Sequence, residues 1–175
     1  MKEVIYNYDN LTTADIDEEV IRVKGIIIND NDEITLGYCN EKYQFPGGHL
    51  NSGESLEEGL LREIEEETGI TVTPAGYKPF EKITHYSKNY RGTDKNRKNE
   101  IYYYIVKTNE MYDMDKTKLD DYEKERGYYA QRIPLKDVEQ VLIDSIKEDG
   151  SNKVIVEEML DAIKEYKKIR DYKNN

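Results

Sequence analysis

Three glutamates stand close together in the segment GGHLNSGESLEEGLLREIEEETGI, which covers residues 47–70. Glu63, Glu66 and Glu67 are spaced i, i+3 and i+4, so a helix would place them on one face. Like charges at that spacing repel one another in water, but a divalent cation reverses the sign of the effect. Clustered carboxylate oxygens suit Mg²⁺ or Mn²⁺. The glutamates therefore predict a metal site, and the alternative is a solvated acidic helix face.

The residues around these glutamates predict the helix that carries them. Ser55 is a good N-cap, and Glu58 stands three residues later, as in a capping box. The helix is expected to run from about residue 56 to residue 68, and Gly69 fits its C-terminal stop. A stripe of leucine and isoleucine beside the carboxylates can pack on a sheet.

The fixed positions of a longer pattern enclose the same helix. Gly48 is followed by Glu54 after five residues, and Arg62 and Glu63 come after seven more. The pattern continues with Ile64, Glu66, Glu67, Gly69 and Ile70. This arrangement resembles the signature of the Nudix hydrolase family, and every fixed position of that signature between residues 48 and 70 is filled. At a typical frequency of about 7% per residue type, a chance match is not credible.

The resemblance implies a fold and an activity. The Nudix fold is an α/β/α sandwich with a mixed sheet, and family members mostly hydrolyse a diphosphate linkage in a nucleoside diphosphate attached to another group. We therefore expect an α/β fold and a hydrolase that uses Mg²⁺ or Mn²⁺ as its cofactor. Such ions neutralise diphosphate charge and lower the pKa of a bound water, which is the chemical reason for the dependence. The alternative is a regulatory Nudix domain that binds nucleotides without turnover.

The same resemblance implies roles for individual residues. Glu63, Glu66 and Glu67 are the expected metal ligands, and Glu63 is also expected to help activate water. Arg62 is expected to hold these catalytic carboxylates by ion pairing, and the carbonyl of Gly47 to add a metal ligand. The remaining members of the signature are expected to have structural or supporting roles: Gly48, Glu54 and Gly69.

A further acidic residue is expected outside the signature, because family members commonly place another metal ligand or base in a later loop. The segment LDDYEKERGYY, residues 119–129, holds the candidates. Glu123 is the first choice for this catalytic acid and Glu125 the second, and Glu100 comes after both. The alternative is that these residues are ordinary surface charges.

The segment 85–98 has a local excess of basic residues in an otherwise anionic chain. Lys88 and Arg91 could attract the phosphates of a substrate. Tyr86 and Tyr90 could stack on a base or a sugar. These four residues are therefore predicted to bind substrate, and the alternative is a solvated loop.

Strand and helix patterns on both sides of the predicted helix complete the expected domain. Strands are expected at residues 20–28, 34–39, 70–73, 80–85 and 101–107, and helices at residues 134–142 and 153–172. Residues 87–100 are expected to form a loop. Strands before and after a central helix predict an α/β fold with a mixed sheet. Residues 20–175 are interpreted as a single domain with its C-terminal helix, and residues 1–19 as an N-terminal arm or an extra strand.

The composition restricts the partners and the location of the protein. The formal net charge is −11 over 175 residues, so we expect a small nucleotide-type substrate and no long nucleic acid. The single cysteine, Cys39, fits a reducing compartment. The N-terminus lacks a signal-peptide pattern, and no apolar run is long enough to span a membrane. A cytoplasmic protein without a membrane partner is expected, and the two ends of the chain could support a homodimer.

Two other activities fit the residues less well. Prenyl-diphosphate isomerases share the fold, but their reaction would need a catalytic cysteine near the signature, which Cys39 alone does not supply. Hydrolysis of an RNA end is compatible with the fold, but the charge of −11 makes long RNA a poor partner.

Overall fold

The computed structural model describes residues 1–73 and 76–174. Within these residues the strands are β1 (Lys2–Tyr6), β2 (Glu18–Ile28), β3 (Glu33–Cys39), β4 (Lys42–Gln44), β5 (Tyr77–Ser87), β6 (Arg97–Lys107) and β7 (Tyr129–Pro134). The α-helices of the same part of the chain are α1 (Leu56–Thr68), α2 (Asp121–Glu125), α3 (Val138–Asp144) and α4 (Lys153–Asn174). None of these described helices is both long and apolar enough to cross a membrane.

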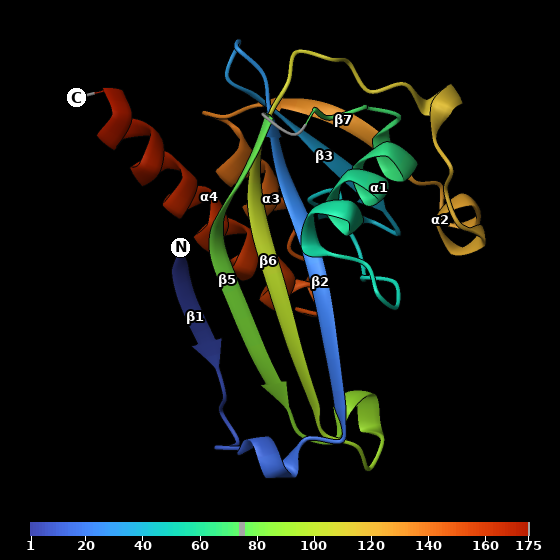
Figure 1. The fold of residues 1–175 in the computed structure, drawn as a ribbon, viewed down its shortest axis with the longest axis vertical. Helices are drawn as coiled ribbons and strands as arrows, with labels where there is room; N and C mark the ends of the chain where they lie inside the picture. The colour runs from blue at the N-terminus through green and yellow to red at the C-terminus, as the bar shows by residue number, and fades with distance from the viewer. Residues whose placement is uncertain (74–75, 175) are drawn as a thin grey trace.

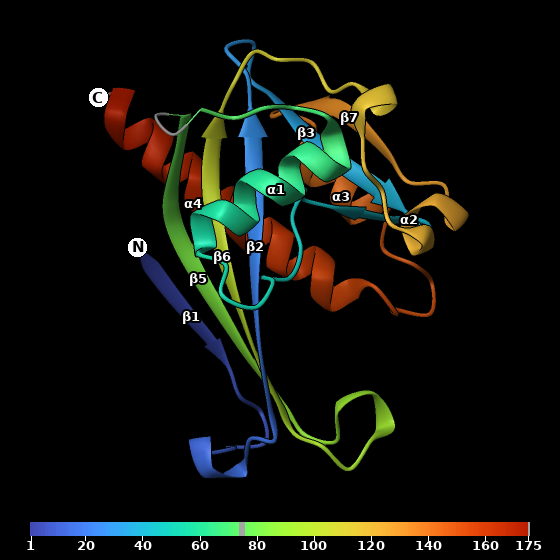
Figure 2. The same cartoon turned by 45° about the vertical axis from the view of Figure 1, so that its right-hand side comes forward.

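The described strands form one mixed sheet of seven strands. Neighbouring strands follow the order β1–β5–β6–β2–β3–β4, and β7 lies beside β3. Strands β2 and β6 are parallel, whereas β5 and β6 are antiparallel. Helices α1 and α4 lie on opposite faces of this sheet, as the two views in Figures 1 and 2 agree. The predicted α/β fold with a mixed sheet between helices is confirmed.

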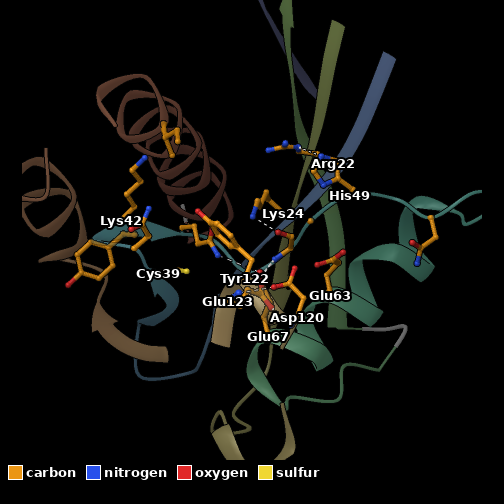
Figure 3. A pocket seen from close by; sticks show the side chains of 17 residues that line it. Arg22, Lys24, Cys39, Lys42, His49, Glu63, Glu67, Asp120, Tyr122 and Glu123 are labelled. Atoms are coloured by element: carbon orange, nitrogen blue, oxygen red, sulfur yellow. Dashed lines mark hydrogen bonds between the residues drawn. The ribbon is translucent and has the colours of Figure 1, made fainter. Parts of the chain in front are cut away.

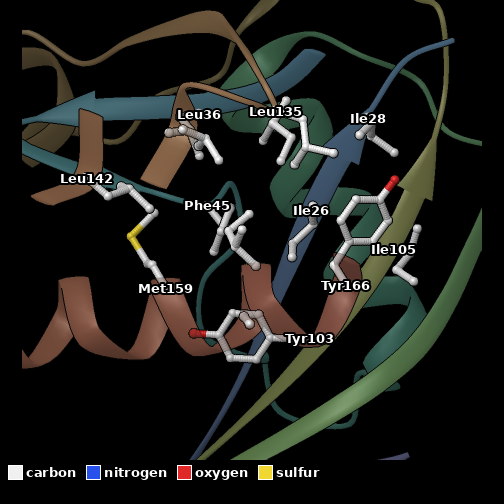
Figure 4. Close-up of a cluster of buried hydrophobic side chains, with 14 of the residues drawn as sticks. Ile26, Ile28, Leu36, Phe45, Tyr103, Ile105, Leu135, Leu142, Met159 and Tyr166 are labelled. Carbon is white, nitrogen blue, oxygen red and sulfur yellow. The ribbon is translucent and has the colours of Figure 1, made fainter. Parts of the chain in front are cut away.

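Strand β2 runs through the middle of the molecule and is covered on both faces. Ile26 and Ile28 join the larger apolar cluster with side chains of α3 and α4 (Figure 4). Val23 and Ile27 belong to a second cluster, which contains the apolar side chains of α1. A strand that is buried on both faces needs apolar residues at successive positions, and the run Gly25–Ile28 meets that need.

Helix α1 begins and ends at the residues that the sequence predicts. The Ser55 hydroxyl accepts a hydrogen bond from the backbone N–H of Glu58, and the Glu58 carboxylate accepts one from the N–H of Ser55 at 2.9 Å. Gly69 has a left-handed φ of 71°. A Cβ atom at Gly69 would lie 2.4 Å from the carbonyl oxygen of Asp113. Backbone conformation and lack of space therefore both require glycine at the end of this helix.

Two short strands are missed by the sequence patterns. These strands are β4 and β7, and both pair with β3. Lys42 of β4 lies opposite Cys39, and Tyr129 of β7 lies opposite Tyr38. Neither KYQ of β4 nor YAQRIP of β7 shows a clear alternation of apolar and polar residues. The partner strand, rather than the local pattern, therefore determines where these strands form.

Two predicted elements are wrong or displaced. Residues 70–73 do not form a strand, although Ile70 and Val72 are buried in the cluster beside α1. Their apolar pattern reports burial rather than pairing with a neighbouring strand. The helix predicted at 134–142 starts later, because Pro134 is the last residue of β7. A proline is tolerated there, at the end of a strand.

Strands β2 and β6 extend farther than their apolar residues indicate. Strand β6 begins at Arg97, inside the expected loop 87–100, and pairs in parallel with β2 from Glu18 onwards. Arg97 Nη2 lies 2.7 Å from a carboxylate oxygen of Glu18. Cross-strand ion pairs stabilise this polar part of the sheet, which reaches beyond the helices in Figure 1.

Strand β1 attaches the N-terminal residues to the same sheet by parallel pairing with β5. Lys2 Nζ lies 2.7 Å from the carboxylate of Glu81 on β5 and 2.8 Å from that of Asp161 on α4. The side chain of Glu81 is fully buried, so its charge depends on Lys2 for a partner. The ion pair thus fixes β1 at the edge of the sheet.

We expect Lys2→Met to lower the free energy of unfolding by about 2–3 kcal/mol, because it leaves the buried Glu81 carboxylate without its cation. Urea unfolding followed by circular dichroism measures this change. Adding Glu81→Gln to Lys2→Met should recover most of the loss, and Lys136→Met, at an exposed lysine, serves as the control. A loss below about 0.5 kcal/mol would show that the pair does not hold β1 in place.

Candidate active site

A cavity of about 390 Å³ lies between β2, the loop after β4, α1 and the α2 region (Figure 3). Its acidic side chains come from α1 and the α2 region: Glu63, Glu67, Asp120 and Glu123. Its basic side chains come from β2 and β4: Arg22, Lys24 and Lys42. One part of the cavity can therefore attract a cation and the other an anion.

Glu67 is a buried carboxylate that lines this cavity, with an exposed fraction of 4%. Its Oε2 accepts a hydrogen bond from the N–H of Gly47 at 2.8 Å and another from the hydroxyl of Tyr128 at 3.4 Å. Burial raises the pKa of Glu67 to about 8, and the neighbouring ammonium of Lys24 opposes this rise. A cation in the cavity therefore stabilises the charged form of Glu67.

Two consecutive glycines bring the loop after β4 close to β2 and α1. Gly47 has a φ of 134°, and a Cβ atom there would lie 2.2 Å from the carbonyl oxygen of Val23. A Cβ atom at Gly48 would lie 2.4 Å from Oε2 of Glu63. Gly47 therefore permits the backbone path, and Gly48 leaves room for a carboxylate.

Arg62 binds the carboxylates of three glutamates. Its guanidinium contacts both oxygens of Glu54, at 2.7 Å and 2.9 Å. Its Nη1 donates to Glu63 at 2.8 Å and to Glu66 at 3.0 Å. Its Nη2 also donates to the carbonyl oxygen of His49 at 3.0 Å. The planar guanidinium thus holds the start of the helix and two of its acidic side chains in one arrangement.

Two of the three predicted metal ligands, Glu63 and Glu67, line the cavity, and Glu66 does not. Arg62 Nη1 holds the Glu66 carboxylate beside that of Glu63, at 3.0 Å and 2.8 Å. In residues 1–73 and 76–174, no group of three or more histidine, cysteine, aspartate or glutamate side chains is placed to hold a metal ion. The carbonyl of Gly47, the fourth predicted ligand, belongs to a cavity-lining residue and accepts a hydrogen bond from Lys24.

The ion pair of Glu54 with Arg62 predicts a pH dependence of stability. Hydrogen bonds from Arg62 lower the pKa of Glu54 from 4.5 to about 2. A lowered pKa in the folded state means that the stabilisation is complete above pH 4.5 and is lost as the pH falls towards 2. We expect Glu54→Gln to lower the free energy of unfolding by about 1 kcal/mol at pH 7, a value reduced for solvent screening.

Urea unfolding of the parent and Glu54→Gln between pH 7 and pH 3 measures this dependence. The difference between the two proteins should narrow below pH 4.5. A constant difference over this range would show that the carboxylate charge of Glu54 contributes nothing to stability.

Of the acidic residues outside the signature, Glu123 lines the cavity and Glu125 does not. Glu123 lies in α2, a short helix that the sequence analysis misses, and its carboxylate accepts a hydrogen bond from the N–H of Asp120 at 2.9 Å. Glu125 is exposed. Glu100 instead pairs with Lys82 at 2.7 Å on the sheet. Among these three candidates, the structure brings Glu123 alone to the other cavity carboxylates.

The four residues predicted to bind substrate in the segment 85–98 do not line the cavity. Tyr86 belongs to β5, and Lys88, Tyr90 and Arg91 lie in the connection between β5 and β6. The guanidinium carbon of Arg97 lies over the Tyr90 ring, 3.8 Å from the ring centroid. This contact occupies one face of the ring, and a substrate role for the four residues stays a prediction.

The basic residues of the cavity are missed by the sequence analysis. Arg22 and Lys24 alternate with apolar residues in the middle of β2, so they share one face of that strand. Arg22 Nε donates to Nε2 of His49 at 3.1 Å, and His49 also lines the cavity. The available signal is the pair of cations just before the apolar end of a central strand, because charged residues are rarely buried unless they are paired.

The side chain of Lys24 extends from β2 into the cavity, near the carboxylates of Glu63 and Glu67. Its Nζ donates to the carbonyl oxygens of Phe45, at 2.9 Å, and of Gly47. Burial lowers the pKa of Lys24, and the charge of Glu67 opposes this effect. The ammonium is therefore a cation that the protein itself supplies to the acidic part of the cavity.

The sequence resembles a known protein family and several characterised proteins. The family model for the NUDIX domain matches residues 20–149. The chain is 39% identical over 67 residues to the 8-oxo-dGTP diphosphatase of Escherichia coli K12. This alignment covers 35% of this chain and 50% of that protein. It is also 39% identical over 54 residues to the ADP-ribose pyrophosphatase of Methanocaldococcus jannaschii, covering 29% of this chain and 32% of that protein. The match spans half or less of each of these relatives.

Solved structures show the same fold. The NUDIX domain of Shewanella oneidensis NrtR, determined with ADP ribose, superposes with a TM-score of 0.52 at 16% identity, covering 75% of this chain and 82% of that chain. A MutT/nudix family protein from Enterococcus faecalis gives a TM-score of 0.51 at 18% identity, covering 71% of this chain and 47% of that chain. At these identities the likeness concerns the fold alone. Because the family model covers most of the sequence and the intact signature lies within it, the chain belongs to the NUDIX domain family.

Proposed function

We propose that the protein is a pyrophosphohydrolase that depends on Mg²⁺ or Mn²⁺ and cleaves a diphosphate linkage in a small nucleotide derivative. The observation that carries this proposal is the cavity in which Glu63, Glu67 and Glu123 face Arg22 and Lys24. Membership of the NUDIX family and relatives named as diphosphatases and pyrophosphatases support it.

The donor set of the cavity fits a hard divalent cation. Carboxylates of Glu63 and Glu67 and the carbonyl of Gly47 supply the oxygen ligands that Mg²⁺ and Mn²⁺ prefer. Glu66 is the third carboxylate of the signature, and Arg62 holds it beside Glu63. A cation bound by these residues would neutralise the diphosphate charge and lower the pKa of a water molecule.

The remaining side chains suit the handling of phosphates and protons. Arg22 and Lys42 can bind phosphate oxygens and orient them. Glu123 lies on the acidic side of the cavity, close enough to Glu67 for its charge to act on that group. We assign Glu123 the role of the additional acid or base, because it lines the same cavity as the proposed metal ligands Glu63 and Glu67.

A small substrate agrees with the charge distribution. The net charge of −11 repels a long polyanion, whereas the basic residues of the cavity can attract the phosphates of a small substrate. One relative, from Zymomonas mobilis, is named RNA pyrophosphohydrolase and is 41% identical over 51 residues. We favour free nucleotides over RNA ends because the basic side chains that line the cavity are few: Arg22, Lys24 and Lys42.

The test is an analysis of products released with Mg²⁺ from nucleoside triphosphates, nucleotide sugars, dinucleoside polyphosphates and ADP-ribose. The double variant Glu66→Gln/Glu67→Gln serves as the blank. Turnover of one compound by the parent and not by the variant is the expected result. Reaction in H₂¹⁸O then shows which phosphorus atom is attacked, because that product carries the label.

The same panel tests the alternative of a regulatory domain. Tight nucleotide binding that survives Glu67→Gln, with no product from any compound in the parent protein, would contradict the proposed hydrolase and support a binding role. Calorimetry with each nucleotide provides the binding measurement, so the two functions give different results on the same proteins.

A further inference from the structure

Lys24 reaches from β2 into the cavity and binds the carbonyl that we assign to the cation. Its Nζ donates to the carbonyl oxygen of Phe45 at 2.9 Å and also to that of Gly47. The carboxylates of Glu67 and Glu63 lie close enough for their charges to act on this ammonium. In Figure 3 the Lys24 side chain lies between Arg22 and the carboxylates of Glu63 and Glu67, whereas Lys42 lies apart from them.

The ammonium and a divalent cation need the same ligands. Both are attracted by the carboxylates of Glu63 and Glu67, and both need the carbonyl oxygen of Gly47. Like charges separated by a few ångströms repel strongly where little water screens them. A cation bound to Gly47 must therefore displace Lys24 from that carbonyl.

We propose that Lys24 is a built-in competitor for the divalent cation, a role that rests on the proposed metal-dependent function. In the metal-free protein its ammonium balances the charge of Glu67 and links the Gly47 loop to β2. After displacement, the ammonium can bind a phosphate oxygen in the same cavity, beside Arg22 and Lys42. Lys24 therefore weakens binding of the cation alone. It favours binding of the cation together with a phosphate compound, because the displaced ammonium then has a phosphate oxygen as its partner.

Lys42 provides a matched control for this proposal. It lines the same cavity but extends from β4 instead of β2. Lys24→Met and Lys42→Met each remove one positive charge and keep an unbranched side chain. Both variants therefore increase the general attraction for a cation, but Lys24→Met alone also frees the Gly47 carbonyl.

The experiment titrates MnCl₂ into each protein without nucleotide and follows the electron paramagnetic resonance signal of free Mn²⁺. We expect Lys24→Met to bind Mn²⁺ about tenfold more tightly than the parent, and Lys42→Met to stay within about threefold of the parent. Circular dichroism checks that each variant is folded. Lys24→Gln is the second variant, and a gain in the same direction is expected from it.

A second titration adds a non-hydrolysable nucleoside triphosphate analogue before Mn²⁺. The increase in Mn²⁺ affinity caused by the analogue should be smaller in Lys24→Met than in the parent, because the displaced ammonium no longer contributes to phosphate binding.

Equal or weaker Mn²⁺ binding by both Lys24 variants would overturn the proposal. An equal gain in Lys24→Met and Lys42→Met would also overturn it, because the effect would then be general electrostatics. If the parent hydrolyses a diphosphate with Mn²⁺ while the affinities are unchanged, the competitor role fails and the proposed function stands. If none of the proteins binds Mn²⁺ with or without the analogue, and the parent hydrolyses no compound of the panel, both fail together.

Discussion

Glu67→Gln is expected to lower kcat for the hydrolysed diphosphate by about 10³-fold, the scale found when a group that stabilises transition-state charge or moves a proton is removed. Glu67 is 4% exposed, lines the cavity and accepts a 2.8 Å hydrogen bond from the N–H of Gly47. Glutamine keeps the size of the side chain and an acceptor for Gly47. The loss should therefore fall on catalysis and cation binding rather than on folding.

The measurement compares kcat of the parent and Glu67→Gln at saturating Mg²⁺, with thermal unfolding as a test of the fold. Glu65→Gln is the matched control, because Glu65 lies on the same helix but pairs at the surface with Lys118 at 2.8 Å. Its kcat should stay within about twofold of the parent. A Glu67→Gln enzyme that keeps more than about a tenth of the parent kcat would contradict the role proposed for this carboxylate.

Gly48→Ala is the second change with a large expected effect, and we expect kcat to fall by about 10²-fold with little loss of stability. The added methyl group would lie 2.4 Å from Oε2 of Glu63, so the carboxylate must move. The end of a glutamate side chain can rotate away at small cost, which spares the fold. The displaced carboxylate would no longer lie where the cavity needs it.

A double-mutant cycle separates this effect from a general disturbance of the loop. Glu63→Gln is made alone and together with Gly48→Ala, and kcat is measured for all four proteins. If Gly48 acts through Glu63, its replacement should cost much less in the Glu63→Gln background. Independent, multiplicative losses would instead show that Gly48 acts by shaping the loop itself.

Helix α1 shows which parts of a fold local sequence determines. Its start depends on hydrogen bonds between Ser55 and Glu58, three residues apart, and its end on the left-handed conformation of Gly69. Such interactions form within a few residues of the chain, so they can be deduced without knowledge of the partner elements. The spacing of the glutamates and Arg62 on one helix follows from the same local geometry.

The sheet shows the opposite case. Strands β4 and β7 form because β3 offers them backbone partners, and the first residues of β6 form a strand because Arg97 pairs with Glu18, far away in the sequence. The segment at residues 70–73 has a strand-like composition and buries Ile70 and Val72, but it has no strand partner. Composition reports burial, whereas strand pairing depends on contacts between distant residues.

For the candidate site, the sequence by itself determined the family signature and the identity of most acidic side chains, because their chemistry and spacing lie within a single short segment. Only the tertiary structure decided which of them share the cavity: it brings Glu123 there from α2, and it places Lys24 on the Gly47 carbonyl. These placements depend on how β2, α1 and α2 pack together, and a packing arrangement between distant segments leaves no spacing pattern in the sequence.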